Sequence, residues 1–319
     1  MHTITKPHVE YLSIDEDQAG QRLDHFLQHH WKSAPKGLCF RLLRTGQIRV
    51  NGKRAKPDYR LAAGDELRLP PVSVEAPPDS SRVERWIPEC LFEDETMMVV
   101  NKPAGLAVHG GSGIEFGLIE RLRRTYPEFK HLELVHRIDR DTSGILLVAK
   151  KRQALVKLHE MLREHKVRKV YLAGVQGYWP EGERKRIELP LFKYVLASGE
   201  RRVKVDKQQG QPSSTVVEGI EAWPEFSLLR AEPLTGRTHQ IRVHLASTGY
   251  PIGGDDKYAP DAWNAQLAKQ GLKRMFLHAW KLSLRHPISG APLELEAPLP
   301  PELSKFLDIL RKQNLKIVT

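Results

Sequence analysis

The sequence is poor in the features that stabilise secreted and membrane proteins. Its 319 residues include two cysteines, Cys39 and Cys90, which lie in separate segments and support neither a disulfide framework nor a cysteine-based zinc site. The longest apolar runs, such as Ile145–Ala149, have the length of a strand and are too short to cross a membrane. Residues 1–17 lack a basic start followed by an apolar stretch, so they do not resemble a signal peptide. We therefore expect a cytoplasmic protein from a reducing compartment.

Positive charge is in excess and is concentrated near the N-terminus. The chain has 50 Lys and Arg against 39 Asp and Glu, a formal net charge of +11, and a pI near 9.6. Between Gln21 and Pro70, eleven basic residues face four acidic ones. This balance favours a polyanionic partner such as nucleic acid, and an anionic membrane surface is the competing interpretation.

The basic segment has the pattern of a small α/β module. Apolar residues at helical spacing predict one helix from Leu23 to Trp31 and a second from Leu38 that stops at Gly46. The alternating residues 48–50 lead into Asn51-Gly52, a strong hairpin signal, and a further strand is predicted at 66–69. A solvated surface would explain scattered lysines, whereas arginines clustered at a helix end and a strand favour phosphate contacts.

This segment resembles the S4 RNA-binding domain in residues 41–53 and 63–67. The resemblance implies docking on structured RNA. The contacts that it implies are Arg41, Arg44, Arg49, Lys53 and Arg54.

The sequence predicts two domains joined by a linker. We expect an S4 domain at 20–70, and a linker at 71–86, where Pro70-Pro71, Pro77-Pro78 and Asp79–Ser81 interrupt regular structure. From 87 to 319, consecutive strands with few helices between them predict an α+β domain whose mixed, mainly antiparallel sheet is flanked by helices. Strands are expected near 97–100, 169–175, 215–220, 226–231 and 276–284, and helices near 118–122, 154–162 and 303–310.

The stretch His136–Gly144 holds two Asp, two Arg, one His and two hydroxyls between the apolar runs 132–135 and 145–149. Buried ionised groups cost several kcal/mol each unless they are paired, so such a cluster inside a core usually has a function. A polar hairpin turn is the alternative, because Asp-Thr-Ser-Gly is ordinary turn chemistry. The local sequence alone favours neither interpretation.

Two further polar groups accompany this stretch. Residues 235–244 carry two arginines, two histidines and a glutamine, and Lys169 and Tyr171 are two apart on a predicted strand and so share one face. A buried Arg needs a carboxylate and a buried Asp needs a cation, so the clusters at 136–144 and 235–244 satisfy each other if they meet. A purely structural ion pair is the competing interpretation.

Together these motifs resemble the RluA-type pseudouridine synthases. The matching segments, in order, are Asn101–Gly105, His136–Gly144, Lys169–Tyr171, Gly236–His244 and Leu277–Ala279. The resemblance implies isomerisation of uridine to pseudouridine in large-subunit (23S) ribosomal RNA, without metal or organic cofactor. The alternatives are a non-catalytic S4 ribosome-assembly factor that binds RNA, and the same chemistry on transfer RNA. We further expect a monomer with no obligate protein partner and no membrane association.

The resemblance also implies roles for individual residues. Asp139 matches the catalytic aspartate and Arg242 the arginine that pairs with it, an opposite charge that is expected to keep the carboxyl ionised. Tyr171 matches the tyrosine that stacks on the target base, and Arg137 an arginine that fills the space the base leaves. The substrate-binding residues that we expect are Arg137, Lys169, His239, Gln240 and Leu277.

Overall fold

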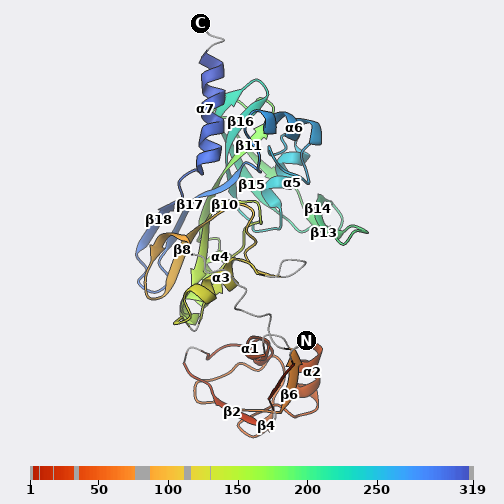
Figure 1. The fold of residues 1–319 in the computed structure, drawn as a ribbon, viewed down its shortest axis with the longest axis vertical. Helices are drawn as coiled ribbons and strands as arrows, with labels where there is room; N and C mark the ends of the chain where they lie inside the picture. The colour runs from red at the N-terminus through yellow and green to blue at the C-terminus, as the bar shows by residue number, and fades with distance from the viewer. Residues whose placement is uncertain are drawn as a thin grey trace. The chain divides into compact units, whose positions relative to one another are not determined.

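The chain folds as two units, Met1–Arg85 and Trp86–Thr319, in the computed structural model of this protein (Figure 1). The structure describes residues 3–6, 8–16, 18–31, 36–75, 87–110, 116–129 and 131–315. Residues 76–86, most of the predicted linker, lie outside the described ranges. At the start of the predicted linker, residues 72–75 form strand β6 (Val72–Glu75), which pairs with β1 (Thr3–Lys6). The prolines at 70 and 71 precede this strand, and its first residue, Val72, is buried in the core of the unit.

The first unit combines two helices with a small antiparallel sheet, as predicted. Apolar residues of both helices meet the sheet in one core that includes Leu23, Leu27, Leu43 and Leu67. Asn51 and Gly52 adopt φ of 50° and 73°, the left-handed conformation of the tight hairpin turn that their sequence indicated. The elements are α1 (Leu23–His30), α2 (Lys36–Arg44), and a sheet in the order β2 (Glu10–Ser13), β5 (Glu66–Leu69), β3 (Arg49–Val50), β4 (Lys53–Arg54).

The second unit is built on a mixed sheet, which confirms the predicted α+β class. Among the described strands of this unit, β10 and β17 pair in parallel and the other pairs are antiparallel. Along the sheet the order is β12 (Arg184–Glu188), β15 (Ser214–Trp223), β16 (Phe226–Pro233), β11 (Arg168–Gln176), β17 (Leu277–Arg285), β10 (Ser143–Ala149), β8 (Met97–Lys102) and β7 (Glu89–Glu93), with β18 (Pro292–Glu296) on β17 and β9 (Glu133–Leu134) on β10.

Strand β10 is buried on both faces, which explains its uninterrupted apolar sequence. Ile145 and Leu147 pack in the cluster that contains residues of α4 (Arg152–Arg163), while Leu146 and Val148 pack with residues of α3 (Leu118–Thr125). Every residue of β10 is therefore covered. The polar loop that precedes this strand, residues 135–142, therefore joins the sheet in the middle of the unit.

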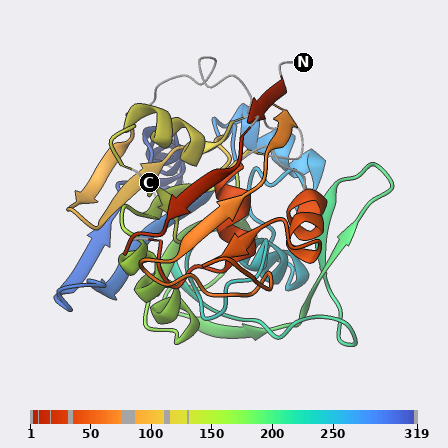
Figure 2. The same cartoon turned by 90° about the horizontal axis from the view of Figure 1, so that it is seen from below.

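The other half of the sheet is covered by three further helices and carries a projecting hairpin. Residues of α5 (Gln240–Ser247), α6 (Asp261–Lys269) and α7 (Pro301–Leu315) share one core with β11, β15 and β16. The hairpin of β13 (Leu191–Val195) and β14 (Arg201–Val205) extends away from the main sheet in both ribbon views (Figures 1 and 2). Among the described residues, no helix has the length and apolar character needed to span a bilayer.

Candidate active site

The polar loop of residues 135–142 connects β9 to β10, and a glycine allows β10 to reach its neighbour. Gly144 has a φ of 107°, and a side-chain carbon there would lie 2.2 Å from the carbonyl oxygen of Ala279. Only glycine permits this approach, through which β10 pairs in parallel with β17. Next to it, Ser143 Oγ lies 2.9 Å from Nδ1 of His278, so the end of the loop is fixed to the sheet.

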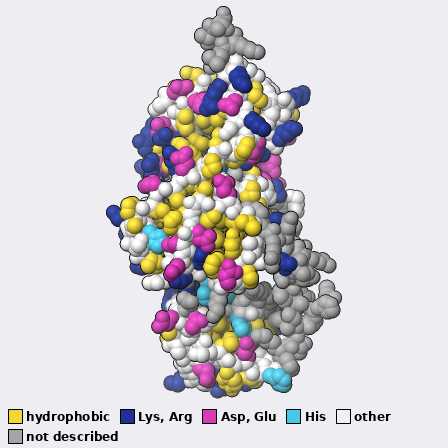
Figure 3. All heavy atoms as spheres, turned by 60° about the vertical axis from the view of Figure 1, so that its left-hand side comes forward, with side chains coloured by type: hydrophobic (Ala, Val, Ile, Leu, Met, Phe, Trp, Pro, Cys, Tyr) yellow, Lys and Arg dark blue, Asp and Glu magenta, His cyan; other side chains and the backbone are white. Residues whose placement is uncertain are grey.

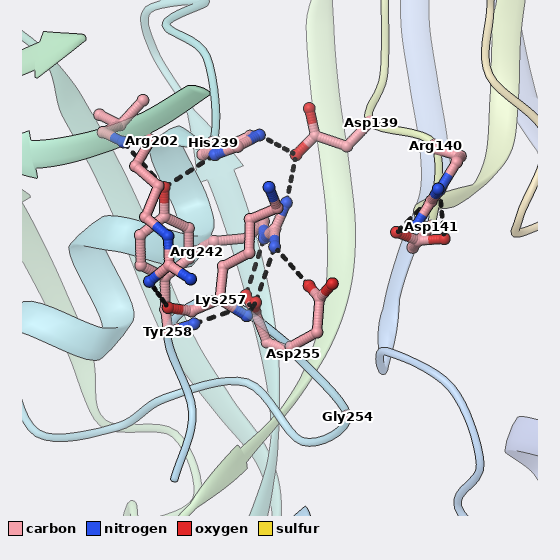
Figure 4. A network of polar contacts seen from close by, with 12 residues as sticks. Asp139, Arg140, Asp141, Arg202, His239, Arg242, Gly254, Asp255, Lys257 and Tyr258 are labelled. Atoms are coloured by element: carbon pink, nitrogen blue, oxygen red, sulfur yellow. Dashed lines mark hydrogen bonds and ion pairs between the residues drawn. The ribbon is translucent and has the colours of Figure 1, made fainter. Parts of the chain in front are cut away.

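The loop brings Asp139 to the first turn of α5, as the sequence analysis required. Arg242 Nη1 donates to Asp139 Oδ2 at 3.2 Å, with side-chain exposures of 3% and 19% respectively. His239 Nε2 lies 3.8 Å from the same oxygen. Figure 4 shows the Asp139 side chain pointing toward Arg242 and His239, whereas Arg140 and Asp141 lie on the other side of the loop. The two polar clusters predicted to meet are therefore in contact.

A second carboxylate, which the sequence analysis missed, holds Arg242 more tightly than Asp139 does. Asp255 accepts from Arg242 Nε and Nη2, both at 2.7 Å, and its side chain is fully buried. Burial by itself lowers the pKa of Arg242, but the Asp255 carboxylate, followed by Asp139, more than offsets this and raises it. The available signal was the acidic pair Asp255-Asp256 after two glycines, since a buried arginine that faces a cleft needs support from behind.

Tyr171 lies in the middle of the sheet, beside the Asp139 loop. The pairing of β11 with β17 shifts register between Val170 and Tyr171, an irregularity that redirects side chains next to functional sites. Tyr171 packs against three separate apolar clusters. Burial, with a contribution from Asp139, raises the pKa of Tyr171, so the phenol is protonated at neutral pH.

Asp139, Tyr171 and Arg242 line one cleft of about 940 Å³. Six Lys and Arg side chains line it against two carboxylates, those of Asp139 and Glu232. Over the face drawn in Figure 3, acidic and basic side chains are interspersed. A nucleoside with its flanking phosphates matches this volume and charge. The cationic residues are Arg137, Arg168, Lys169, Arg186, Arg237 and Arg242.

Three further predicted substrate-binding residues line this cleft. Arg137 is exposed, Leu277 contributes a buried apolar surface, and Lys169 is half-buried, with its pKa lowered by burial. Within the described ranges, no protein group accepts a hydrogen bond from Lys169 Nζ.

The side-chain amide of Gln240, a predicted substrate-binding residue, is hydrogen-bonded within the protein. Its amide oxygen accepts from Thr235 Oγ1 at 2.7 Å and from the Arg237 N–H at 3.0 Å. Its amide nitrogen donates to Ser214 O and Thr215 Oγ1, both at 2.9 Å. Because all these bonds are internal, Gln240 is bound to its own protein and holds the turn that precedes α5.

Lys102, which was given no role in the sequence analysis, is hydrogen-bonded to the backbone of the loop that carries Asp139. Its fully buried ammonium donates to the carbonyls of Pro103 (2.8 Å), Leu106 (2.8 Å) and Arg140 (2.9 Å). Burial lowers the pKa of Lys102 to about 7, while the three acceptors favour the protonated form. The bond to the Arg140 carbonyl fixes the backbone directly after Asp139. Its place in the motif Asn101–Gly105 was the signal that could have revealed it.

In the first unit, the five predicted RNA contacts are all exposed. Arg41 and Arg44, on α2, line a groove of about 530 Å³ together with Phe40 and Lys56. Arg49 and the pair Lys53–Arg54 belong to the adjacent hairpin of β3 and β4. These cations therefore form a basic surface with an exposed aromatic ring, a combination suited to a nucleic-acid strand.

Comparison with known proteins agrees with this geometry. The RNA pseudouridylate synthase family matches residues 96–247, and the S4 domain family matches residues 21–67. The chain is 50% identical over 312 residues to the ribosomal large subunit pseudouridine synthase C of Pasteurella multocida (strain Pm70), covering 96% of this chain and 95% of that protein. The Escherichia coli (strain K12) protein of the same name is 49% identical over 313 residues, with 96% and 98% covered. Among solved structures, human RNA pseudouridylate synthase domain containing 4 aligns with a TM-score of 0.57 at 25% identity, covering 70% of this chain and 92% of that one.

Proposed function

Because this chain belongs to the RNA pseudouridylate synthase family, we propose that it isomerises uridine to pseudouridine in large-subunit ribosomal RNA. The names of its relatives support this substrate, and the S4 domain supports binding to structured RNA. As the family resemblance implies, the reaction needs neither a metal nor an organic cofactor.

The reaction exchanges one bond to the ribose for another. The bond from ribose C1′ to uracil N1 breaks, the uracil turns, and its C5 then bonds to C1′. The proton on C5 leaves and N1 gains a proton, so atoms balance without oxidant or reductant. A carboxylate serves either as nucleophile or as a base at the sugar, and both routes require a carboxylate that faces the nucleoside.

The contact between Asp139 and Arg242 is the observation that carries the proposal. Of the two carboxylates that line the cleft, Glu232 pairs with Arg168 at 2.9 Å, whereas Asp139 has Arg242 Nη1 at 3.2 Å from its Oδ2 and its side chain is 19% exposed. Asp255 is fully buried behind Arg242 and orients it. We assign the reacting carboxylate to Asp139 because it lines the cleft and is partly exposed, whereas Asp255 is fully buried.

The other cleft residues complete a site for one extruded nucleotide. The Tyr171 ring offers a stacking surface worth about 1–3 kcal/mol to the base, and Leu277 adds an apolar floor. Lys169 and the exposed Arg137 supply cations for the backbone or for the space that the base leaves. His239 presents its ring beside Asp139. The Gln240 amide is hydrogen-bonded within the protein, which supports a role in holding the turn before α5.

Replacing Asp139 tests the assignment. Asp139→Asn keeps the shape but removes the charge, so we expect pseudouridine formation to fall by at least about 10³-fold while the affinity for RNA stays within about twofold. The matched control is Asp141→Asn, two residues along in the same loop, where the carboxylate pairs with Arg140 instead. Turnover is measured by mapping carbodiimide adducts of pseudouridine on ribosomal RNA. Normal turnover by Asp139→Asn would refute the assignment.

The same assay separates the alternatives. Wild-type protein that binds ribosomal RNA without modifying it would be an RNA-binding assembly factor. Modification of transfer RNA in preference to ribosomal RNA would keep the chemistry and change the substrate. The cytoplasmic location, the monomeric state and the absence of an obligate protein partner stay predictions, and sedimentation of the purified protein tests the second of them.

A further inference from the structure

The hydroxyl of Tyr258 joins three parts of the catalytic unit. It lies 2.8 Å from His239 Nδ1, and the Val203 N–H of β14 donates to it at 3.0 Å. The Arg242 guanidinium also lies over the Tyr258 ring, with its Cζ 5.1 Å from the ring centroid. Figure 4 shows His239 between Tyr258 and Asp139, with one ring nitrogen facing each of them.

Counting protons across these contacts determines which nitrogen of His239 is protonated. Burial raises the pKa of Tyr258 to about 12, so the phenol keeps its proton, and burial lowers the pKa of His239, which favours the neutral ring. The Val203 amide already donates to the phenol oxygen. Among the described residues, His239 Nδ1 is the acceptor within reach of the phenol proton. This arrangement favours an unprotonated Nδ1, with the ring proton on Nε2.

We propose that Tyr258 is a positioning residue that holds His239 in the Nε2–H tautomer and so directs a second N–H toward Asp139 Oδ2, beside Arg242. This inference rests on the function proposed above. The distance of 3.8 Å from Nε2 to Oδ2 is longer than a hydrogen bond, so the N–H is available to a substrate oxygen that lies to one side, within reach of both groups.

The backbone of His239 supports a fixed orientation. His239 has φ 53° and ψ 21°, a left-handed backbone conformation that residues other than glycine adopt at an energetic cost. The Val243 N–H donates to the His239 carbonyl at 2.9 Å, and Tyr258 holds the ring. Such a conformation persists where the surroundings determine it, and it occurs preferentially at functional sites.

The loop that carries Tyr258 is also attached to the β13–β14 hairpin. Arg202 Nη1 donates to the Lys257 carbonyl at 3.0 Å, and the Lys257 ammonium pairs with Glu200 at the hairpin. Removing the phenol hydroxyl deletes the Val203 contact as well as the His239 contact. A control that weakens the hairpin attachment and leaves the phenol in place is Glu200→Gln.

The test reads the tautomer directly in the RNA-free protein. Histidine labelled with ¹⁵N distinguishes protonated from unprotonated ring nitrogens, and the His239→Gln spectrum assigns the signals. We expect protonated Nε2 in the wild type and in Glu200→Gln, and a mixture or a switch to Nδ1–H in Tyr258→Phe. A wild-type Nδ1–H tautomer would overturn the proposal, whether or not Tyr258→Phe folds.

Kinetics supply the second readout. Loss of one oriented neutral donor corresponds to about a tenfold fall in kcat for Tyr258→Phe, with KM for RNA unchanged within about twofold. Glu200→Gln should match the wild type in both constants. An unchanged tautomer together with unchanged kcat in Tyr258→Phe would overturn the positioning role. Absence of pseudouridine in the wild-type reaction would instead overturn the proposed function, because the tautomer is measured without substrate.

Discussion

Asp255→Asn is the substitution whose effect the structure specifies most sharply. The wild-type carboxylate accepts two short bonds from Arg242, both at 2.7 Å, and two backbone N–H bonds from Lys257 (2.9 Å) and Tyr258 (3.2 Å). An asparagine keeps one acceptor oxygen, but its amide N–H₂ would face guanidinium N–H groups. The buried cation at position 242 would then depend mainly on Asp139, whose closest atom lies at 3.2 Å.

The expected magnitude follows from burial. Both members of the pair are almost completely excluded from solvent, at 3% and 0% side-chain exposure, so little solvent screening applies. Breaking one side of such a pair costs about 3–5 kcal/mol, a large part of the roughly 5–15 kcal/mol that stabilises a typical domain. A displaced Arg242 would also misplace its contact with Asp139, and displacements near 1 Å cost about 10²-fold in rate.

The adjacent residue provides the control. Asp256 lies 3.5 Å from Arg242 Nη2, but its side chain is 63% exposed, so Asp256→Asn should cost less than about 1 kcal/mol. Urea unfolding followed by tryptophan fluorescence gives the stabilities, and single-turnover pseudouridine formation below the unfolding transition gives the rates. Equal stability and equal rates for the two variants would refute the assignment of Asp255 as the support of Arg242.

Two further predictions concern pH and salt. Burial lowers the pKa of His278 to about 4, so between about pH 6.5 and 4 the unfolded chain binds one more proton than the folded chain, and stability falls as the pH falls. From pH 7 to 5 this group alone lowers the free energy of unfolding by about 2 kcal/mol. In urea unfolding, the stability of His278→Gln should therefore fall over this range by about 2 kcal/mol less than that of the wild type. An identical pH dependence for the two proteins would contradict this. In filter binding, Arg41→Ala and Arg44→Ala should each weaken RNA binding and make the plot of log affinity against log salt shallower by about 0.7–0.9, whereas Lys269→Ala, in the other unit, should leave the slope unchanged.

Much of the fold follows from local sequence patterns. The continuous apolar run Ile145–Ala149 could satisfy its side chains only in a strand covered on both faces, and the structure places it there as the body of β10. Asn51-Gly52 is a turn because few other pairs adopt left-handed φ at both positions. The family resemblance implied that Asp139 pairs with Arg242, and the structure shows this contact; the charges alone indicated only that the two polar clusters would satisfy each other if they met.

The sequence by itself indicated that the polar clusters at 136–144 and 235–244 needed partners of opposite charge, and the tertiary structure decided which residues supply them. Asp255 and Tyr258 lie in the segment between α5 and α6, and Lys102 at the end of β8, where no periodic pattern marks a side chain as buried. Their contacts join residues of different elements, such as Lys102 to the Arg140 carbonyl. Likewise, the sequence could not show that the Gln240 amide has four hydrogen-bond partners within the protein. A hydrogen bond depends on distance and direction to within a few tenths of an ångström, and only the folded backbone determines these.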